Sequence, residues 1–435
     1  MRMTTKKEAI MDNKQTVQVK FKQYFYKYQD KFLTVPEHHF LFKTVYGILR
    51  SKHIHLNKIG STLKEDIILK KTCKRLSYHL GKADLHDRLN NSHLEANLWH
   101  LARCRYLIVD SSDVTKKYAE NMEGIARVKD GSTGNIENGY WQTNLICINP
   151  SSSSTVLASS RLYSYKTDKE SAQISENNII LDEITRLDRV LKFKQTVVID
   201  KGGDRRKLIE NFLKEDRPFI IHQTGKRHVV HDGKKKSVST LRKNTALTYT
   251  VTVTSKKSGK NVMHTFHCGA IRVFFPYAQQ DGHFKESLWL VSIQRAGKGR
   301  CSFLCYIDAE TEKEAIEIMM EGYGARWKIE EVHRQVKQDY SYEKIALRRY
   351  VALRNFNVIF WIAMGFLYQQ LEDVSLKLIM AHKEKLVYTG KLKDIGVFHY
   401  YKLSKLVSSV FSSGNIRWPA NKLKIGNNQL ALALE

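Results

Sequence analysis

The sequence lacks any Cys-x-x-Cys pair, although six cysteines are scattered along it. This absence argues against a zinc ribbon or a redox motif, and it favours reduced core thiols in a cytosolic protein. The histidines between positions 222 and 283 also lack cysteine partners and recognised ligand spacing. We therefore interpret them as incidental and expect no zinc site.

The chain also lacks the segments that would direct it to a membrane or out of the cell. No apolar run of about 18 residues is evident. The N-terminal stretch MRMTTKKEAIMDNKQ has no apolar region and no small-residue cleavage site. We therefore expect no membrane partner and a cytoplasmic location.

Acidic residues are few relative to basic ones: 44 Asp and Glu stand against 72 Lys and Arg, giving a net charge of +28. Because 42% of the 435 residues are hydrophobic, the chain is folded and long enough for two or three structural units. The expected partner is a polyanion, and nucleic acid fits best because the basic residues are spread along the whole chain. Residues 201–260 concentrate this charge, which indicates either a nucleic-acid groove or solvated loops with lysine-protected edge strands.

The first 100 residues show helical patterns and almost no strand signal. Thr62 and Glu65 have the spacing of a capping box. The expected helices span residues 20–32, 38–51, 63–80 and 85–101. The last two, joined near Gly81, predict either a DNA-binding helix-turn-helix or a plain helical hairpin with a solvated basic face.

Two short apolar runs further along the chain each end in an aspartate. Residues 105–110 read RYLIVD, and residues 195–200 read QTVVID. Strand patterns at 140–148 and 155–163, a helical pattern at 175–191, and a helix and strand after position 204 surround these runs. Strands that alternate with helices imply a parallel part of a sheet, whose ligand sites lie at the carboxyl ends of the strands. Asp110 and Asp200 are therefore predicted to be neighbours, although a lone aspartate in such a place is more often a turn or helix-cap residue.

The sequence pattern changes at residues 224–302, where runs of β-branched residues alternate with turn residues. This pattern predicts a mostly β insertion. Trp289 within it is a candidate for stacking on a nucleic-acid base, while a core position is the more common role of a tryptophan in an apolar strand. A short strand at 302–307 and a helical stretch at 311–337 follow. An apolar helical segment at 340–371 is expected to close the core against the sheet.

The helical stretch carries Tyr323, Arg326, Glu330 and Lys337 at offsets of 0, 3, 7 and 14 residues. At about 100° per residue these four side chains fall within an arc of roughly 60°. One face of the helix thus presents an acid, two bases and a phenol. A row of intrahelical salt bridges is the ordinary meaning of such a pattern.

Together these residues resemble the DDE transposases of the bacterial insertion-sequence-four family. The Tyr323-x2-Arg326-x3-Glu330-x6-Lys337 spacing matches that family's signature in residue type and spacing, and Asp110 and Asp200 resemble its two catalytic aspartates. The resemblance covers roughly residues 100–370. It implies a ribonuclease H-like catalytic core interrupted by a β insertion, within an α/β protein that has an N-terminal all-α domain.

The resemblance also implies roles. Asp110, Asp200 and Glu330 would be the catalytic residues and would hold two Mg²⁺ ions, with Mn²⁺ as a substitute. In the family, the residues matching Tyr323, Arg326 and Lys337 contact DNA phosphate. The partners would be double-stranded DNA, both transposon ends and target, and a second copy of the chain on that DNA. The reaction would take place in the bacterial cytoplasm at the nucleoid. Trp289 would stack a flipped base if a hairpin forms at the transposon end.

Several alternatives stay open at this point. Asp113, Asp204 and Glu331 lie close in sequence to the three acids and could be ligands in their place. A ribonuclease H-like nuclease that cuts without joining, and an inactive DNA-binding relic, are alternative functions. The expected units are an all-α DNA-binding domain (1–100), the first part of the core (101–223), the β insertion (224–302), the second part of the core (303–371) and a C-terminal helical or loop tail without an assigned role (372–435).

Overall fold

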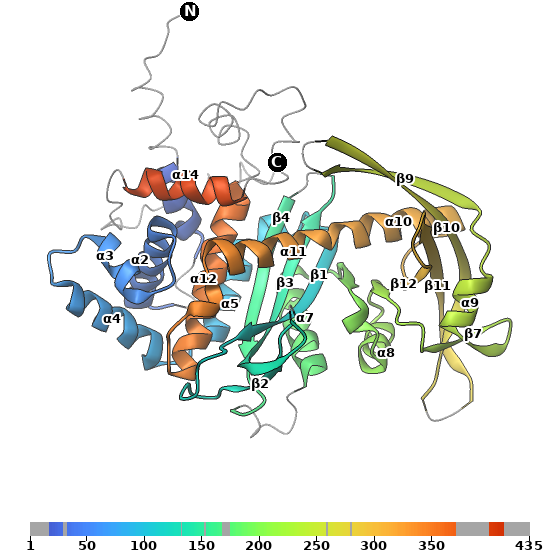
Figure 1. Cartoon of the computed structure of the whole chain (residues 1–435), viewed down its shortest axis with the longest axis horizontal. Coiled ribbons are helices and arrows are strands. Elements are labelled where there is room, and N and C mark those ends of the chain that lie inside the picture. The colour runs from blue at the N-terminus through green and yellow to red at the C-terminus, as the bar shows by residue number, and fades with distance from the viewer. Residues whose placement is uncertain are drawn as a thin grey trace, which may run out of the picture.

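The computed structural model describes residues 17–28, 33–131, 133–151, 154–167, 175–257, 260–278, 281–370 and 400–412. Within them the chain forms an α/β fold around a mixed 12-stranded sheet (Figure 1). The strand order is β2-β3-β1-β5-β6-β12-β11-β10-β7-β8, with β4 paired to β3 and β9 paired to β10. The α/β class expected from the sequence is confirmed.

The first part of the sheet contains the two parallel pairings, β1 with β5 and β5 with β6. Its strands are β1 (Tyr106–Thr115), β2 (Ala126–Lys129), β3 (Ile136–Asn149), β4 (Ser154–Tyr163), β5 (Thr196–Ile199) and β6 (Phe219–His222). Helices α7 (Glu176–Leu191) and α8 (Arg206–Lys214) connect β4 to β5 and β5 to β6. Ser175 begins α7 by accepting a hydrogen bond from the backbone N–H of Asn178.

The second part of the sheet is antiparallel and joins the first where β12 pairs with β6. Its elements are β7 (His228–His231), β8 (Lys234–Ser237), α9 (Val238–Asn244), β9 (Tyr249–Lys257), β10 (Lys260–Pro276), β11 (His283–Arg295) and β12 (Cys301–Tyr306). Residues 260–276 form one long strand, β10, which pairs with β9 on one side and β11 on the other. The β-rich character of this region was expected, whereas β7, β8 and α9 were not.

Each face of the sheet carries its own core, because side chains alternate along a strand. Leu107 and Val109 of β1 pack in the core that contains the apolar faces of α7 and α8. Tyr106 and Ile108 point the other way, into the core shared with α10 (Glu312–Ala325), α11 (Trp327–Arg334) and α12 (Tyr350–Gln370). Figure 1 shows α10 and α11 crossing this second face end to end.

The N-terminal region is helical, as expected. Helices α2 (Val35–Ser51), α4 (Leu69–Lys82) and α5 (His86–Ala96) all contact α12, while the short helices α3 (Leu56–Leu63) and α6 (Leu98–Leu101) lie between them in the chain. Asn355 of α12 holds the turn between α4 and α5, donating to the carbonyls of Leu80 and Ala83 and accepting from the N–H of Leu85. Helix α14 (Tyr400–Ser412) contacts α2 and α12. The proposed domain boundaries stay predictions.

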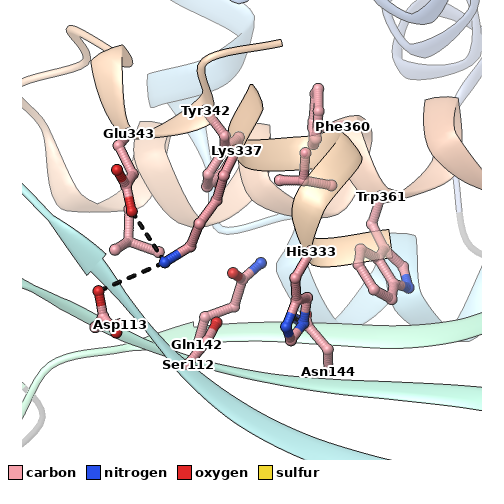
Figure 2. Close-up of a pocket in the computed structure, with 12 residues that line it drawn as sticks. Ser112, Asp113, Gln142, Asn144, His333, Lys337, Tyr342, Glu343, Phe360 and Trp361 are labelled. Carbon is pink, nitrogen blue, oxygen red and sulfur yellow. Dashed lines mark hydrogen bonds and ion pairs between the residues drawn. The ribbon is translucent and has the colours of Figure 1, made fainter. Parts of the chain in front are cut away.

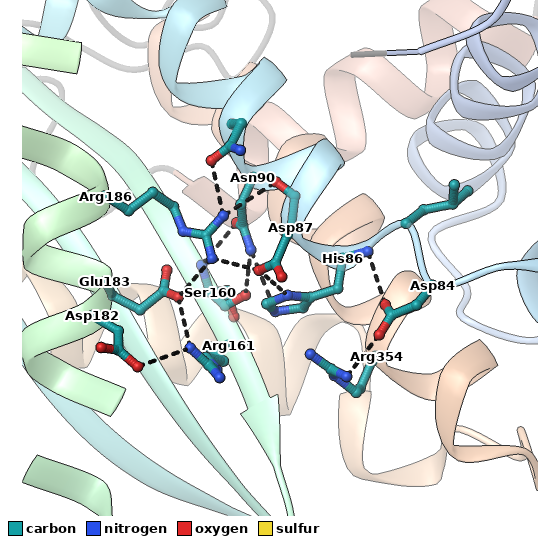
Figure 3. Close-up of polar contacts among 12 residues, drawn as sticks. Asp84, His86, Asp87, Asn90, Ser160, Arg161, Asp182, Glu183, Arg186 and Arg354 are labelled. Atoms are coloured by element: carbon teal, nitrogen blue, oxygen red, sulfur yellow. Dashed lines mark hydrogen bonds and ion pairs between the residues drawn. The ribbon is translucent and has the colours of Figure 1, made fainter. Parts of the chain in front are cut away.

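An ionic cluster fastens α5 to α7 and β4 (Figure 3). Glu183 of α7 is fully buried and lies 3.5 Å from both Arg161 and Arg186. Arg186 also pairs with Asp87 of α5. Removing one member of such a buried cluster typically costs more than the cluster contributes, because an uncompensated charge remains.

One local expectation about helices was wrong. Thr62 does not cap a helix: it lies inside α3 and donates to the carbonyl of Ile59, and the next helix begins at Leu69. Among the described residues, α12 is one helix that is long and apolar enough, by length and composition, to cross a membrane. However, 89% of its apolar window is buried inside the protein, as in the core helix of a soluble protein.

Candidate functional site

Asp110 and Asp200 occupy equivalent positions on neighbouring parallel strands. The last parallel pair between β1 and β5 is Val109 with Ile199, and the aspartates are the next residues on each strand. Burial raises the pKa of the Asp200 carboxyl, and the nearby Asp110 carboxylate raises it further. The structure therefore brings these two acids together. One detail differs from expectation, since β1 continues past Asp110 to Thr115 in its antiparallel pairing with β3.

The segment with the four signature residues is two helices and a π-helical turn, instead of one helix. Helix α10 ends at Ala325, α11 begins at Trp327, and Arg326 forms the junction between them. Gly322 lets α10 approach the sheet closely, because a Cβ atom there would lie 2.7 Å from side-chain atoms of both Tyr106 and Ile220. This close approach carries the end of α10 to the ends of the parallel strands.

Glu330 and Arg326 form an ion pair between α11 and the junction. Burial by itself would lower the pKa of Arg326, but Tyr323, Glu330 and Asp110 outweigh it and raise the pKa. Arg326 thus lies among the acids and, at 17% side-chain exposure, is largely shielded from solvent. The structure brings Arg326 close to Asp110 and Asp200 and pairs it with Glu330.

Tyr323 lies on the same side and contacts the end of β6. Its hydroxyl is 2.9 Å from Nδ1 of His222, and Arg326 lies 5.4 Å from the centre of its ring. Burial, and then the positive charges of Lys201 and Arg326, lower the pKa of His222 to about 4. His222 is therefore neutral at physiological pH.

Lys337 is separated from the other three signature residues. It lies in a π-helical turn, Gln335–Asp339, which changes the helical register after α11. Its ammonium group is 3.0 Å from Glu343 and 3.6 Å from Asp113, as Figure 2 shows. Buried Lys116 fixes the turn that carries Glu343 by donating to two backbone carbonyls, and burial lowers its pKa to about 7. The expectation of one shared face thus holds for three residues, while Lys337 lies beyond them.

The carboxylate oxygens of Asp204, one alternative ligand, already accept hydrogen bonds from other residues of the protein. Its side chain is 2% exposed and accepts hydrogen bonds from the N–H and hydroxyl of Thr224 and from Nε of Arg227. Both carboxylate oxygens are used in holding the segment that follows β6. Asp204 therefore has a structural place, while Asp200 faces the site.

The other two alternatives are also buried. Asp113 is 7% exposed at its side chain and accepts from the N–H of Gly131 in addition to its contact with Lys337. Glu331 is 6% exposed and pairs with Lys328. By contrast, the side chains of Asp110 and Glu330 are 20% and 35% exposed.

The three acids offer a donor set of hard oxygens for a divalent cation. Asp110 uses one oxygen toward His333, Asp200 one toward the N–H of Gly202, and Glu330 one toward Arg326. Each keeps a second oxygen that has no partner among the residues described. Their side chains do not form a closed cluster there, since the described residues contain no group of three or more His, Cys, Asp or Glu arranged to hold a metal ion. The donor chemistry fits Mg²⁺, provided that Glu330 leaves Arg326.

The structure does not support base stacking by Trp289. The residue is 4% exposed, its Nε1 donates to the carbonyl of Ala309, and the guanidinium of Arg272 lies 3.8 Å from the ring centre. The indole therefore belongs to the core. Trp327, at the start of α11, is 48% exposed beside Arg326 and was not singled out from the sequence.

Sequence reasoning also missed His333 and Asn144. His333 lies one helical turn after Glu330, and its Nδ1 is 3.2 Å from Oδ2 of Asp110. Asn144 lies opposite Asp110 on β3, and its amide is 3.0 Å from Nε2 of His333. The available signal for Asn144 was its place, with Gln142, at alternate positions of residues 140–148, where Thr143 is the one other residue that is neither aliphatic, aromatic nor cysteine.

Comparison with known proteins adds no assignment. No protein-family model matches the chain, and a search of curated proteins gave no match. The resemblance to a transposase family therefore rests on the residues and spacings themselves.

Proposed function

We propose that this protein is a DDE transposase that cuts DNA at the ends of an insertion sequence and joins those ends to a target. The observation that carries the proposal is that Asp110 and Asp200 come directly after the paired residues of neighbouring parallel strands and lie close together, with Arg326, the ion-pair partner of Glu330, near both of them. Asp110, Asp200 and Glu330 are the three residues that resemble the catalytic triad of the insertion-sequence-four family.

The sheet order supports a ribonuclease H-like core as the finer description of the fold. In the run β4-β3-β1-β5-β6, β3 is antiparallel to both of its neighbours, and β1, β5 and β6 are parallel to one another. Helices α7 and α8 lie in the connections on one face, and α10 and α11 cover the other. In the chain, strands β7 to β12 come between β6 and the helices α10 and α11, and the resemblance implies a β insertion between the last core strand and the Glu-bearing helix.

Asp110, Asp200 and Glu330 would hold the metal ions through the oxygens that have no partner in the described part of the chain. A pair of Mg²⁺ ions, when bound, activates the attacking oxygen of water or of a DNA 3′ end and stabilises the leaving oxygen. Neither half of the reaction needs further protein groups, because positioning and charge stabilisation do most of the work. The same site can therefore both hydrolyse a phosphodiester and transfer a strand.

Arg326 is placed to exchange partners when DNA arrives. In the structure its guanidinium pairs with Glu330, which neutralises a carboxylate that a cation would need. A DNA phosphate near Tyr323 would offer Arg326 a second anionic partner, since guanidinium groups bind phosphate well. Glu330 would then be released to the metal site. Lys337, which already lies at the protein surface near Asp113 and Glu343, would contact a phosphate further along the strand.

The proposal includes the biological setting that the resemblance implies. Joining two transposon ends requires two active sites, so the functional unit would be a dimer on double-stranded DNA. The reaction would occur in the bacterial cytoplasm, at the nucleoid. The net charge of +28 supports a DNA partner, because phosphate contacts supply most non-specific affinity.

The test is cleavage of linear DNA that carries the chromosomal sequences on both sides of the gene. Purified protein is incubated with Mg²⁺, and nicks, double-strand breaks, hairpins and joined products are resolved on denaturing gels. Glu330→Gln should abolish every product while DNA binding in a mobility-shift assay persists. Glu331→Gln is the matched control, because the neighbouring acid is buried against Lys328 and should leave the reaction chemistry in place.

The outcomes separate the candidate functions. Cleavage followed by joining to a supercoiled target supports a transposase, whereas cleavage without joining would favour a nuclease. Binding of the wild-type protein without any cleavage would favour an inactive relic. Full activity of Glu330→Gln would refute the assignment of the site.

A further inference from the structure

A row of polar side chains crosses the sheet beside the candidate site. Asp110 on β1 lies opposite Asn144 on β3, and Asn144 lies opposite Ser160 on β4. Asn144 and Ser160 are 1% and 0% exposed, yet they lie on a face that is otherwise packed against apolar helices. Buried polar groups are costly unless every one is paired, so this row requires a hydrogen-bonding explanation.

The hydrogen bonds in this row have a defined direction. The Ser160 hydroxyl accepts from the amide nitrogens of Gln142 at 2.9 Å and Asn357 at 2.8 Å, which occupy both of its acceptor positions. Its single proton therefore goes to Oδ1 of Asn144, 2.6 Å away. Asn144 must then turn its NH₂ group toward Nε2 of His333, at 3.0 Å.

The far end of the network fixes the same direction. Oδ1 of Asn357 accepts from both Gln142 and the Tyr342 hydroxyl, at 2.8 Å and 2.6 Å. The backbone of Ser160 is held in turn by the side chain of Asn90, which contacts both its carbonyl and its N–H (Figure 3). The serine cannot rotate its hydroxyl to another partner without leaving a buried group unpaired.

We propose that Asn144 and Ser160 hold His333 in the tautomer that carries its proton on Nδ1, so that His333 donates to Asp110 and aims its carboxylate at the metal site. An Nε2 atom that accepts from Asn144 has no proton of its own, and a neutral imidazole then has its proton on Nδ1. Nδ1 lies 3.2 Å from Oδ2 of Asp110. Figure 2 shows His333 and Asn144 side by side between α11 and the sheet.

His333 is thus a positioning residue that acts through Asp110, an inference that rests on the proposed function. A neutral donor orients the carboxylate without cancelling its charge, and it leaves the second oxygen of Asp110 for a cation. Groups that orient metal ligands in this way typically contribute about 10- to 100-fold to metal affinity. The direction of the hydrogen bonds from Ser160 to His333 does not depend on a bound metal or on the proposed function.

The first test is nitrogen-15 NMR of the imidazole rings in the full-length, metal-free protein, with the His333 signals assigned by their loss in His333→Gln. A protonated Nδ1 and an unprotonated Nε2 are expected. Asn144→Asp puts an acceptor in front of Nε2 and should move a proton onto that atom. Tyr342→Phe, which removes only the far hydroxyl, is the control and should leave the tautomer unchanged. A proton on Nε2 in the wild-type protein would overturn the inference.

The second test is the dissociation constant for Mn²⁺, measured by titration calorimetry without DNA. His333→Asn retains an amide donor at the place of Nδ1, whereas His333→Gln puts its amide at the place of Nε2. We expect His333→Gln and His333→Ala to weaken Mn²⁺ binding about 10-fold, and His333→Asn to restore most of it. Asp110→Asn identifies the binding event that belongs to this site.

The results distinguish this inference from the proposed function. Equal Mn²⁺ affinity of all three His333 variants, in a protein that binds Mn²⁺ through Asp110 and cuts DNA, would overturn the inference alone. The expected tautomer and affinities in a protein that never cuts DNA would support the inference and contradict the proposed function. Wild-type protein that cuts DNA but binds no Mn²⁺ in the absence of DNA would overturn the inference and leave the proposed function in place.

Discussion

Two sets of acidic residues lie almost side by side in the sequence and are treated in opposite ways by the fold. Asp110, Asp200 and Glu330 are partly exposed, and each has an oxygen with no partner among the residues that the structure describes. Asp113, Asp204 and Glu331 are buried and held by Lys337, Thr224 with Arg227, and Lys328. We call these the open acids and the buried acids.

The difference shows how one pattern of residues serves chemistry and stability at once. A buried acid with cationic or N–H partners is part of the framework, and its removal leaves those partners uncompensated. An open acid gives little to the framework and retains the capacity to bind something else. Substitution of an open acid should therefore change DNA cleavage, whereas substitution of a buried acid should change the free energy of unfolding.

The largest expected effect is the loss of DNA cleavage on substitution of an open acid. Asp110→Asn should lower the cleavage rate by at least about 10³-fold, because it removes a charge that the chemistry uses directly. Its thermal unfolding should change little. Single-turnover cleavage assays and calorimetry on the same preparation check both expectations. Asp113→Asn is the comparison, and a loss of cleavage as great as that of Asp110→Asn, without destabilisation, would reverse the assignment.

The next largest effect should be a loss of stability on substitution of a buried acid. Asp204→Ala leaves Arg227, which is 11% exposed, without its carboxylate partner, and should lower the free energy of unfolding by about 3–5 kcal/mol. Urea denaturation followed by circular dichroism measures this change. An unchanged midpoint would show that Asp204 is not part of the framework, and its exclusion as a ligand would then fail.

A smaller effect is expected at Lys337, which connects the two groups of acids because it pairs with buried Asp113 and lies beside the site. Lys337→Gln should weaken DNA binding about 5- to 10-fold and lower the salt dependence of that binding by about one phosphate contact. Lys328→Gln, which breaks the pair with Glu331, is the matched control. Mobility-shift titrations at several salt concentrations compare the two, and equal effects would argue against a phosphate contact by Lys337.

The smallest effect concerns the pH dependence of stability. Because burial and Asp110 raise the pKa of Asp200, the folded state holds more protons than the unfolded state between the two pKa values. Stability contributed by this group therefore falls as the pH rises through that window and stays lower at neutral pH. Asp200→Asn should raise the unfolding temperature of the metal-free protein at pH 7.

This gain should disappear as the pH falls below the folded-state pKa of Asp200. Differential scanning fluorimetry across pH 4 to 7 gives the comparison, and exposed Asp308→Asn serves as the control. A lower unfolding temperature for Asp200→Asn at pH 7 would contradict the repulsion between the two open acids.

Much of the sheet could be predicted because strand and helix signals are local. The runs that end at Asp110 and Asp200 are apolar and rich in β-branched residues, and the helix from Glu176 has both a cap and an amphipathic face. The break at Arg326 and the π-helical turn at Lys337 could not be predicted in this way. The four signature residues are spaced as on one continuous helix, whereas the structure divides the segment at Arg326 and changes its helical register at residues 335–339.

The burial of Trp289 and the role of α12 also could not be predicted from local sequence signals. An apolar strand with a tryptophan fits a core position and a binding surface equally well until the covering side chain, here Arg272, is known. A long apolar helix fits a membrane span as well as a core, and only its contacts with α2, α4, α5 and β4 decide between them.

The sequence by itself determined the α/β class, the three candidate acids and the spacing of the signature, because these are expressed by residues near one another in the chain. The tertiary structure decided which acid of each neighbouring pair is open, where Lys337 lies, and that His333 and Asn144 join the site. The physical reason is that exposure, ion pairing and hydrogen-bond direction arise between strands and helices that meet only after folding. The row from Asp110 to Ser160 has no counterpart in any local pattern of the sequence, since its members come from three separate strands.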